Sequence, residues 1–317
     1  MPPKVRVVWL IDARFEREWL MTLLSKPGAW EIEEIEADPT PLQQPQTLAH
    51  AKLYPPGTLF IFNRSIMYER YFARYEEAGI PFAAVHLSDE FYSDTYNFYE
   101  HRMCMWVARN YWHPKLAEMP KVFTFGLGWK NGFKSVQTAA EPPPEWKDRP
   151  YSVSFAGNIH HTMRRDFVAA FEDVPGHYFH LTFDGFNSAS GLKLAEYRDM
   201  MNKSKYVLCP IGHFNVDCFR VYEALEAGAV PIAIMWTSAQ RWQYWNTLFE
   251  VGERGIPWIQ AGAPNGCRYE YEKMLHNTDA EQAAANATRQ LWDATKAKWT
   301  GYFHKGIQRL LDLYVVA

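Results

Sequence analysis

Apolar and polar positions alternate along the first half of the chain in blocks that predict strands separated by helices. Residues 15–24 and 67–78 place apolar side chains three and four positions apart, the spacing of an amphipathic helix. Short apolar runs predict strands at 5–11, 58–62, 80–87, 103–108 and 121–125. Strands that alternate with helices in this way indicate parallel βαβ units in a wound sheet.

The alternation stops at residues 139–150 (AAEPPPEWKDRP), where proline and charge predict a linker, and then starts again. Strands are expected at 152–156, 177–183, 206–209 and 230–234, and helices at 163–171, 192–202 and 216–227. The pattern predicts an α/β protein with two Rossmann-like, doubly wound domains. Their ligand sites would lie at the carboxyl ends of the strands and face each other across a cleft. The expected boundaries are 1–145 for the N-terminal domain, 146–300 for the C-terminal domain, and 301–317 for a final helix that braces the first domain.

Composition agrees with this picture and removes several classes of function. A chain of 317 residues with 48% hydrophobic and 22% charged residues suits two packed domains of about 150 residues each. The net charge of −3, without a basic run, argues against a nucleic-acid polymer as partner. The 13 Trp, 18 Tyr and 20 Phe residues suit a sugar-binding cleft, although large cores explain most of them. Four widely spaced cysteines without a C-x-x-C pair argue against a zinc site and a disulfide scaffold.

The helix predicted at 216–227 carries the strongest chemical signal. Arg220 and Glu223 are three residues apart and therefore lie on one face. Near the helix N-terminus, Arg220 could hold a diphosphate through paired hydrogen bonds and stabilise it as a leaving group. Glu223 could accept hydrogen bonds from the two hydroxyls of a ribose. The alternative is an ordinary surface ion pair.

A second signal follows the strand predicted at 152–156. Gly157 and Asn158 form a turn before the next helix, and Arg164 lies one turn inside that helix. Free main-chain N–H groups at such a turn suit a phosphate, whereas the alternative is a solvated basic helix start. His160 and His161 are adjacent, but no second cluster of ligands has the spacing of a metal site, so no metal is expected.

A third signal lies in the first half, where Asp89 and Glu90 follow a predicted strand. A carboxylate at that position could take the proton from an attacking hydroxyl as a general base. The two side chains point to opposite sides of an extended chain, so one of them would serve. The alternative is a helix N-cap formed by Ser88 or Asp89.

The glycine pattern at 126–132 (GLGWKNG) resembles a dinucleotide-binding turn, but no strand that ends in an acidic residue follows it at the required distance. A dehydrogenase is therefore disfavoured. The chain also has no D-x-D motif, which argues against a metal-dependent transferase of the GT-A type.

The C-terminal motifs, taken in order, resemble those of the exostosin-like glycosyltransferases. These motifs are Phe155-x-Gly157 with Arg164, Tyr197, Ser204-Lys-Tyr-Val-Leu-Cys-Pro210-x-Gly212, and Arg220-x-x-Glu223-Ala-Leu-x-Ala-Gly228-x-x-Pro231. The N-terminal residues His86-x-x-Asp89-Glu90, Arg109-Asn-Tyr-Trp112 and Gly126-x-Gly128 are similar to a short branch of the family. That branch includes ribitol-phosphate xylosyltransferase and enzymes of algae and their large viruses.

The resemblance implies a GT-B fold, a UDP-sugar donor such as UDP-xylose, and inversion at the anomeric carbon without an essential metal or other cofactor. It implies that Arg220 binds the diphosphate, Glu223 the ribose, and Arg164 the phosphate as a supporting ligand. Gly157, Asn158, Pro210 and Gly212 would complete the donor site. Asp89 or Glu90 would be the base that activates a hydroxyl of a glycan acceptor.

Two other classes of function remain open at this point. They are a non-catalytic two-domain protein that binds a sugar or nucleotide-sugar, and an epimerase or phosphorylase of similar architecture. The apolar run at 5–11 is too short to span a membrane and lacks a cleavage site, so a cytoplasmic protein is expected. A lumenal Golgi domain that has lost its anchor is the alternative.

Overall fold

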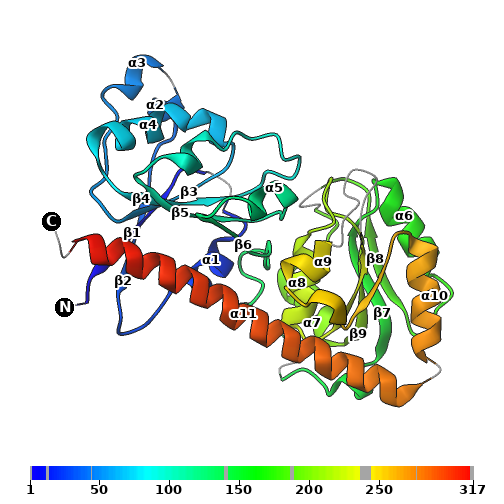
Figure 1. The fold of residues 1–317 in the computed structure, drawn as a ribbon. Helices are drawn as coiled ribbons and strands as arrows, with labels where there is room; N and C mark the ends of the chain where they lie inside the picture. Colours follow the sequence, from blue (N-terminus) through cyan, green and yellow to red (C-terminus); the bar gives the residue numbers. More distant parts are fainter. Residues whose placement is uncertain are drawn as a thin grey trace. The chain divides into compact units, whose positions relative to one another are not determined.

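The chain folds into two α/β units (Figure 1). The computed structural model describes residues 2–11, 14–43, 45–138, 142–185, 189–235, 244–275 and 277–314. Unit 1 comprises Met1–Gly126 together with Lys296–Ala317, and unit 2 comprises Leu127–Thr295. Within the part of the chain that the structure describes, no helix has both the length and the apolar character needed to cross a membrane.

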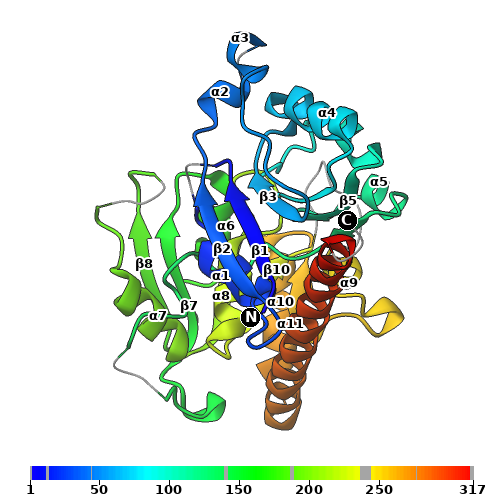
Figure 2. The same ribbon diagram turned by 90° about the vertical axis from the view of Figure 1, so that its left-hand side faces the viewer.

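Unit 1 is built on a six-stranded sheet in the order β2-β1-β3-β4-β5-β6, in which all neighbouring strands are parallel. Figure 2 shows β1 and β2 side by side. The strands are β1 (Lys4–Trp9), β2 (Glu31–Glu36), β3 (Thr58–Phe62), β4 (Phe82–His86), β5 (Cys104–Arg109) and β6 (Val122–Thr124). The helices are α1 (Arg17–Leu24), α2 (Thr40–Gln43), α3 (Pro45–Leu48), α4 (Glu69–Ala78) and α5 (Pro114–Ala117), with short 3-10 helices at Ser65–Met67 and Asn97–Glu100.

Successive side chains of a strand point to opposite faces, so the central strands of unit 1 supply two packed layers. On one face, Phe60 and Phe62 of β3 meet the rings of α4; the Phe62 and Phe72 centroids are 5.2 Å apart. On the other face, α1 and the last turns of the C-terminal helix cover the sheet. There Trp19 meets Trp299, with the ring centroids 6.1 Å apart. Both faces are buried, which is the ordinary condition of a parallel sheet.

Unit 2 is built on a five-stranded parallel sheet in the order β11-β10-β9-β7-β8. The strands are β7 (Tyr151–Asn158), β8 (Tyr178–Thr182), β9 (Ser204–Cys209), β10 (Val230–Ile234) and β11 (Ile259–Ala261). The helices are α6 (Thr162–Ala169), α7 (Leu194–Asn202), α8 (Phe219–Glu226), α9 (Tyr244–Leu248), α10 (Pro264–Leu275) and α11 (Thr278–Tyr314), with 3-10 helices at Trp146–Asp148 and Gly252–Arg254. In Figure 1, α6 and α10 lie on one face of this sheet and α7, α8 and α9 on the other.

The long helix α11 contributes to both units. In unit 2, its Trp292 packs on Trp129, and the indole N–H of Trp292 donates to Glu226 Oε2 at 2.9 Å. In unit 1, Trp299 and Phe303 of the same helix are fully buried. The sequence predicted a final helix at 301–317, and in the structure residues 301–314 are the end of a longer helix that begins at Thr278.

The boundary between the units differs from the predicted one. The chain passes from unit 1 to unit 2 after Gly126, and residues 296–300 belong to unit 1. The predicted linker at 139–150 lies in unit 2, with 139–141 outside the described residues. Arg149 is buried there and donates to the Ser204 and Ala227 carbonyls at 2.9 Å each. Proline and charge indicated a linker, but the charged Arg149 in this segment forms hydrogen bonds to main-chain carbonyls of unit 2.

Both sheets follow the same order when they are numbered along the chain within each unit. Five strands of unit 1 run 2-1-3-4-5, and the strands of unit 2 repeat this order as β8-β7-β9-β10-β11. In such a sheet the connections from the first and third strands lead to opposite sides, so the strand order switches between these two strands. Ligands bind outside the carboxyl ends of the strands at this switch point. For unit 2 this point lies between β7 and β9.

Candidate functional site: the carboxyl edge of the unit 2 sheet

The predicted donor-site residues of unit 2 lie at the switch point of its sheet. Gly157 and Asn158 end β7, and Pro210 and Gly212 follow β9 directly. Arg220 and Glu223 lie on α8, which follows the turn after β9. The topology therefore gathers residues that are far apart in the sequence at one edge of one sheet.

Arg220 lies against the end of β7. Its guanidinium carbon is 4.6 Å from the centroid of the Phe155 ring, within the range of a cation–π contact. One terminal nitrogen donates to the Ala156 carbonyl at 3.1 Å. Among the described residues, the buried Nε has no acceptor. The guanidinium is thus held in a fixed position with donor capacity left over, as an anion site requires.

Gly157 gives Arg220 the room that this position needs. Its φ of +146° is one that residues with a side chain rarely adopt. A Cβ atom built on Gly157 would lie 2.7 Å from the Arg220 Nη2 atom. Next to it, Asn158 accepts a hydrogen bond from the His160 N–H at 2.7 Å, which shapes the turn into α6. The glycine is therefore required by the approach of the guanidinium as well as by its own backbone.

Arg164 has a different immediate role from the predicted one. Its Nη2 donates to the Gly212 carbonyl at 2.7 Å, and its Nε donates to the Ile211 carbonyl at 3.3 Å. Its Nη1 donates to the Asn158 carbonyl at 3.3 Å. The side chain ties the turn after β7 to the turn after β9. Phosphate binding by Arg164 stays a prediction, whereas the positioning of the two turns is observed.

Glu223 is only 4% exposed, and both of its carboxylate oxygens are bonded. The Tyr197 hydroxyl on α7 donates to Oε2 at 2.8 Å. The main-chain N–H of Lys130 donates to Oε1 at 3.2 Å. The alternative of a surface ion pair with Arg220 does not describe this side chain, because Glu223 is buried and its carboxylate is held by α7 and by the segment before β7.

The pKa of Glu223 is raised above its ordinary value, because burial outweighs the hydrogen bonds from Tyr197 and Lys130 and the charges of Arg220 and Lys130. These donors and charges oppose the effect of burial, since they stabilise the ionised carboxylate to which hydroxyl groups can donate. Tyr197 and Lys130 were missed in the sequence because no periodicity marks them. Tyr197 is one of the motif residues that resemble the exostosin-like family, but a single sequence does not show which group its hydroxyl bonds.

In unit 1, Asp89 lies at a buried position and forms an ion pair with the fully buried Arg109 of β5. Its Oδ1 also accepts a hydrogen bond from the Ser93 N–H at 2.9 Å. The carboxylate thus holds the loop after β4, but it is not a helix N-cap, because the next helical segment is the 3-10 helix at Asn97–Glu100 and its N-cap is Tyr96. An ion pair of this kind costs several kcal/mol to break, so Asp89 is poorly suited to exchange protons with a substrate.

The same loop is held by a second buried pair. His86 Nδ1 accepts from Arg109 Nη1 at 2.7 Å, so the ring proton lies on Nε2 and donates to Asp94 Oδ2 at 2.7 Å. Burial and the charge of Arg109 lower the pKa of His86 to about 4. The histidine is therefore neutral at neutral pH and serves as a hydrogen-bond bridge. Asp94 in turn accepts from the Ser65 N–H at 3.0 Å.

Glu90 differs from its neighbour. It is half-buried, and its Oε1 accepts a hydrogen bond from the Tyr111 hydroxyl at 3.2 Å. Of the two carboxylates predicted as base, Asp89 forms the ion pair with the buried Arg109, whereas Glu90 accepts from a tyrosine hydroxyl.

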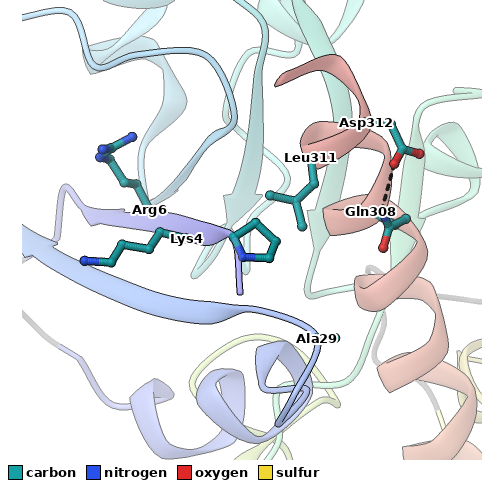
Figure 3. A pocket seen from close by; sticks show the side chains of 7 residues that line it. Lys4, Arg6, Ala29, Gln308, Leu311 and Asp312 are labelled. Carbon is teal, nitrogen blue, oxygen red and sulfur yellow. Dashed lines mark hydrogen bonds between the residues drawn. The ribbon is translucent and has the colours of Figure 1, made fainter. Parts of the chain in front are cut away.

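Unit 1 also has a pocket of about 430 Å³ near its N-terminal strand. Figure 3 shows Gln308, Leu311 and Asp312 on one stretch of α11, with Lys4 and Arg6 extending from β1 away from that helix. The pocket contains none of the predicted site residues. Within the described residues, no group of three or more His, Cys, Asp or Glu side chains is arranged to hold a metal ion.

Comparison with known proteins gives a family match for one part of unit 2. Residues 131–241 match the family described as the RXYLT1 C-terminal domain. This range contains every donor-site residue discussed for unit 2 except Lys130. None of the curated proteins matches the chain.

Among solved structures, an α1,3-fucosyltransferase has a TM-score of 0.50 at 10% sequence identity, with 90% of this chain and 82% of that chain covered. The same values hold for the α1,3-fucosyltransferase with GDP-fucose. At this identity the likeness concerns the fold, and it spans both units. The predicted fold class is confirmed. The two parallel-sheet units, the matched family and these structural neighbours identify the chain as a glycosyltransferase with a GT-B fold.

Proposed function

We propose that this glycosyltransferase moves a sugar from a UDP-sugar, with UDP-xylose as the first candidate, to a hydroxyl of a glycan, with inversion at the anomeric carbon. The observation that carries the proposal is the placement of Arg220 beside Gly157 at the switch point, with the Glu223 carboxylate on the same helix. UDP-xylose is favoured because residues 131–241 match a domain of a ribitol xylosyltransferase.

Unit 2 holds the donor in this proposal. The free donor capacity of Arg220 meets the two phosphates, together with the main-chain N–H groups of the turn that begins at Gly157. Glu223 accepts the ribose hydroxyls. Arg164 keeps the two turns in register, so that Pro210 and Gly212 stay beside the end of β7.

In the transfer, the acceptor oxygen attacks the anomeric carbon and forms the new glycosidic bond. The bond from that carbon to the UDP oxygen breaks, and its electron pair leaves with UDP. Arg220 stabilises the negative charge that develops on the β-phosphate, a role for which a metal is not needed when a guanidinium is fixed there. The proton of the acceptor hydroxyl passes to a carboxylate of unit 1. Glu90 is proposed for this step, because Asp89 is bound by Arg109.

The test is an assay of UDP release from a panel of UDP-sugars, with GDP-fucose included because a structural neighbour binds it. Many transferases cleave their donor slowly without an acceptor, so the assay needs no knowledge of the glycan. We expect release from UDP-xylose, unchanged by EDTA, with a second-order rate constant that falls in Arg220→Ala. Release from GDP-fucose alone would overturn the choice of nucleotide. Loss of activity in EDTA would overturn the metal-independent mechanism.

A further inference from the structure

The glycine-rich segment before β7 packs onto the donor site in the structure, although its sequence pattern resembles a dinucleotide-binding turn. We call the part of this segment that belongs to unit 2, residues 127–136, the strap. Gly132, at a φ of +86°, lies against α7, where an added Cβ would be 2.9 Å from Leu194 Cδ2. The strap thus runs along the same helix that carries Tyr197.

Several charged and aromatic contacts hold the strap in place. Arg198 of α7 donates to the carbonyls of Lys134 and Val136. Lys134 forms an ion pair with Glu226 of α8 at 3.1 Å. The ring of Phe133 lies 6.1 Å from that of Tyr197 in an edge-on arrangement. These bonds join the strap to both helices of the donor site, so the main chain at Lys130 has a defined position.

That position places one donor on each oxygen of the Glu223 carboxylate. The Lys130 N–H donates to Oε1 and the Tyr197 hydroxyl to Oε2. A carboxylate offers roughly four acceptor positions, so about two remain. Two donors from two different elements prevent rotation of the carboxylate. The remaining acceptor positions then point in fixed directions, as pre-organised binding requires.

We propose that Tyr197 and the main-chain N–H of Lys130 position Glu223 to accept both ribose hydroxyls of the nucleotide, so that the site selects a ribonucleotide over its 2′-deoxy analogue. This inference rests on the proposed function, because it takes UDP as the nucleotide. A 2′-deoxyribose leaves one fixed acceptor position of a buried carboxylate without a donor. A site built to bond a hydroxyl rejects a ligand that lacks it for this reason.

The test compares the affinities of UDP and 2′-deoxy-UDP for the full chain by isothermal titration calorimetry. For the wild type we expect UDP to bind about tenfold or more tightly, since a hydrogen bond to a charged group contributes about 1.5–3 kcal/mol. In Tyr197→Phe the ring that meets Phe133 is kept and the hydroxyl is lost. We expect this variant to weaken UDP about tenfold and the deoxy analogue much less, so that the preference falls to about two- or threefold.

Two further variants separate positioning from general damage. Lys130→Ala keeps the N–H and removes the side chain, so it should weaken both nucleotides equally and keep the preference. Tyr269→Phe changes an exposed tyrosine of α10 and should change neither affinity. An unchanged preference in Tyr197→Phe, with UDP still bound, would overturn the inference and leave the proposed function intact. Failure of the wild type to bind UDP at all would overturn the proposed function as well.

Discussion

The carboxyl edges of the two sheets share one strand order and use their charged residues in opposite ways. In unit 1, Arg109 is fully buried and bound to Asp89, and His86 is bound to Asp94. In unit 2, Arg220 lies on the Phe155 ring and donates to one carbonyl. Arg109 forms an ion pair with a carboxylate of its own unit, whereas Arg220 has N–H donors that remain available for a ligand.

The difference teaches that a charged residue at the end of a strand is judged by its partners, because position alone does not distinguish the two edges. An ion pair in a low-dielectric interior fixes a loop strongly but leaves little charge to offer. A guanidinium held by a ring and a carbonyl keeps its full charge. Unit 1 is therefore built for loop geometry at this edge, and unit 2 for an anion.

The largest effect should come from Arg220→Ala. Removal of the guanidinium proposed to stabilise the departing phosphate should lower kcat/KM for UDP-sugar hydrolysis about 10³-fold or more. The melting temperature should change little, since the partly buried side chain donates to one carbonyl and has no ion-pair partner within the part of the chain that the structure describes.

Arg165→Ala is the matched control, because Arg165 lies on α6 with an exposed side chain. Its activity should equal that of the wild type. If Arg220→Ala retained full turnover, the carboxyl edge of the unit 2 sheet would not be the anion-binding site that we propose.

Arg109→Met should have the reverse signature. The substitution leaves Asp89 buried without its arginine, which costs about 3–5 kcal/mol of stability. Hydrogen exchange measured in β4 and β5 should show the loss, whereas UDP affinity of the folded protein should stay within twofold. The double variant Arg109→Met with Asp89→Asn should recover part of the stability. Equal losses in both variants would mean that the ion pair is not what holds the loop.

Glu16→Gln tests a buried carboxyl of unit 1 that carries no ion pair among the described residues. Glu16 is 3% exposed, and burial raises its pKa from 4.5 to about 7, against a smaller opposing effect of its own main-chain N–H. The folded carboxyl keeps its proton up to about pH 7, while the unfolded one loses it near 4.5. Stability therefore falls as pH rises through this window, by about 3 kcal/mol in all.

The glutamine removes that dependence. Denaturant unfolding should show the variant more stable than the wild type at pH 8, by up to about 3 kcal/mol, and nearly equal to it at pH 4. A less stable variant at pH 8 would show that the carboxylate is ionised and bonded in the fold. A loss of transferase turnover in a more stable variant would move the catalytic base from Glu90 to Glu16.

Much of unit 2 could be predicted because its strands are continuous apolar runs and its helices follow at regular intervals. β9 and β10 are almost fully buried and lie where expected. β2 was missed, since its sequence EIEEIE contains only two apolar residues. It is an edge strand whose Glu33 pairs with Arg6 on β1 at 3.1 Å. Charged residues are typical of edge strands, and here they remove the apolar run by which a strand is predicted.

The candidate site was predictable only as far as local spacing reaches. Three positions along a helix place Arg220 and Glu223 near each other without any knowledge of the fold. The groups that bond Glu223 come from 93 and 26 residues away, and no periodicity connects them. Likewise, Asp89 and Glu90 look equivalent in the sequence. Only the fold brings Arg109 to one of them and Tyr111 to the other.

The smallest expected effect, from Tyr111→Phe, addresses that last distinction. Its hydroxyl donates to Glu90, and a single hydrogen bond to a carboxylate contributes about 1.5–3 kcal/mol. If Glu90 is the base, the loss of this donor should lower kcat about three- to tenfold and leave the KM for the donor unchanged, since unit 2 binds the donor. Tyr92→Phe is the matched control, because that hydroxyl donates to the Trp112 carbonyl at 3.0 Å and should have no effect on kcat. An equal kcat in both variants would remove Glu90 from the mechanism, and the carboxyl edge of unit 1 would then be structural at both of its predicted positions.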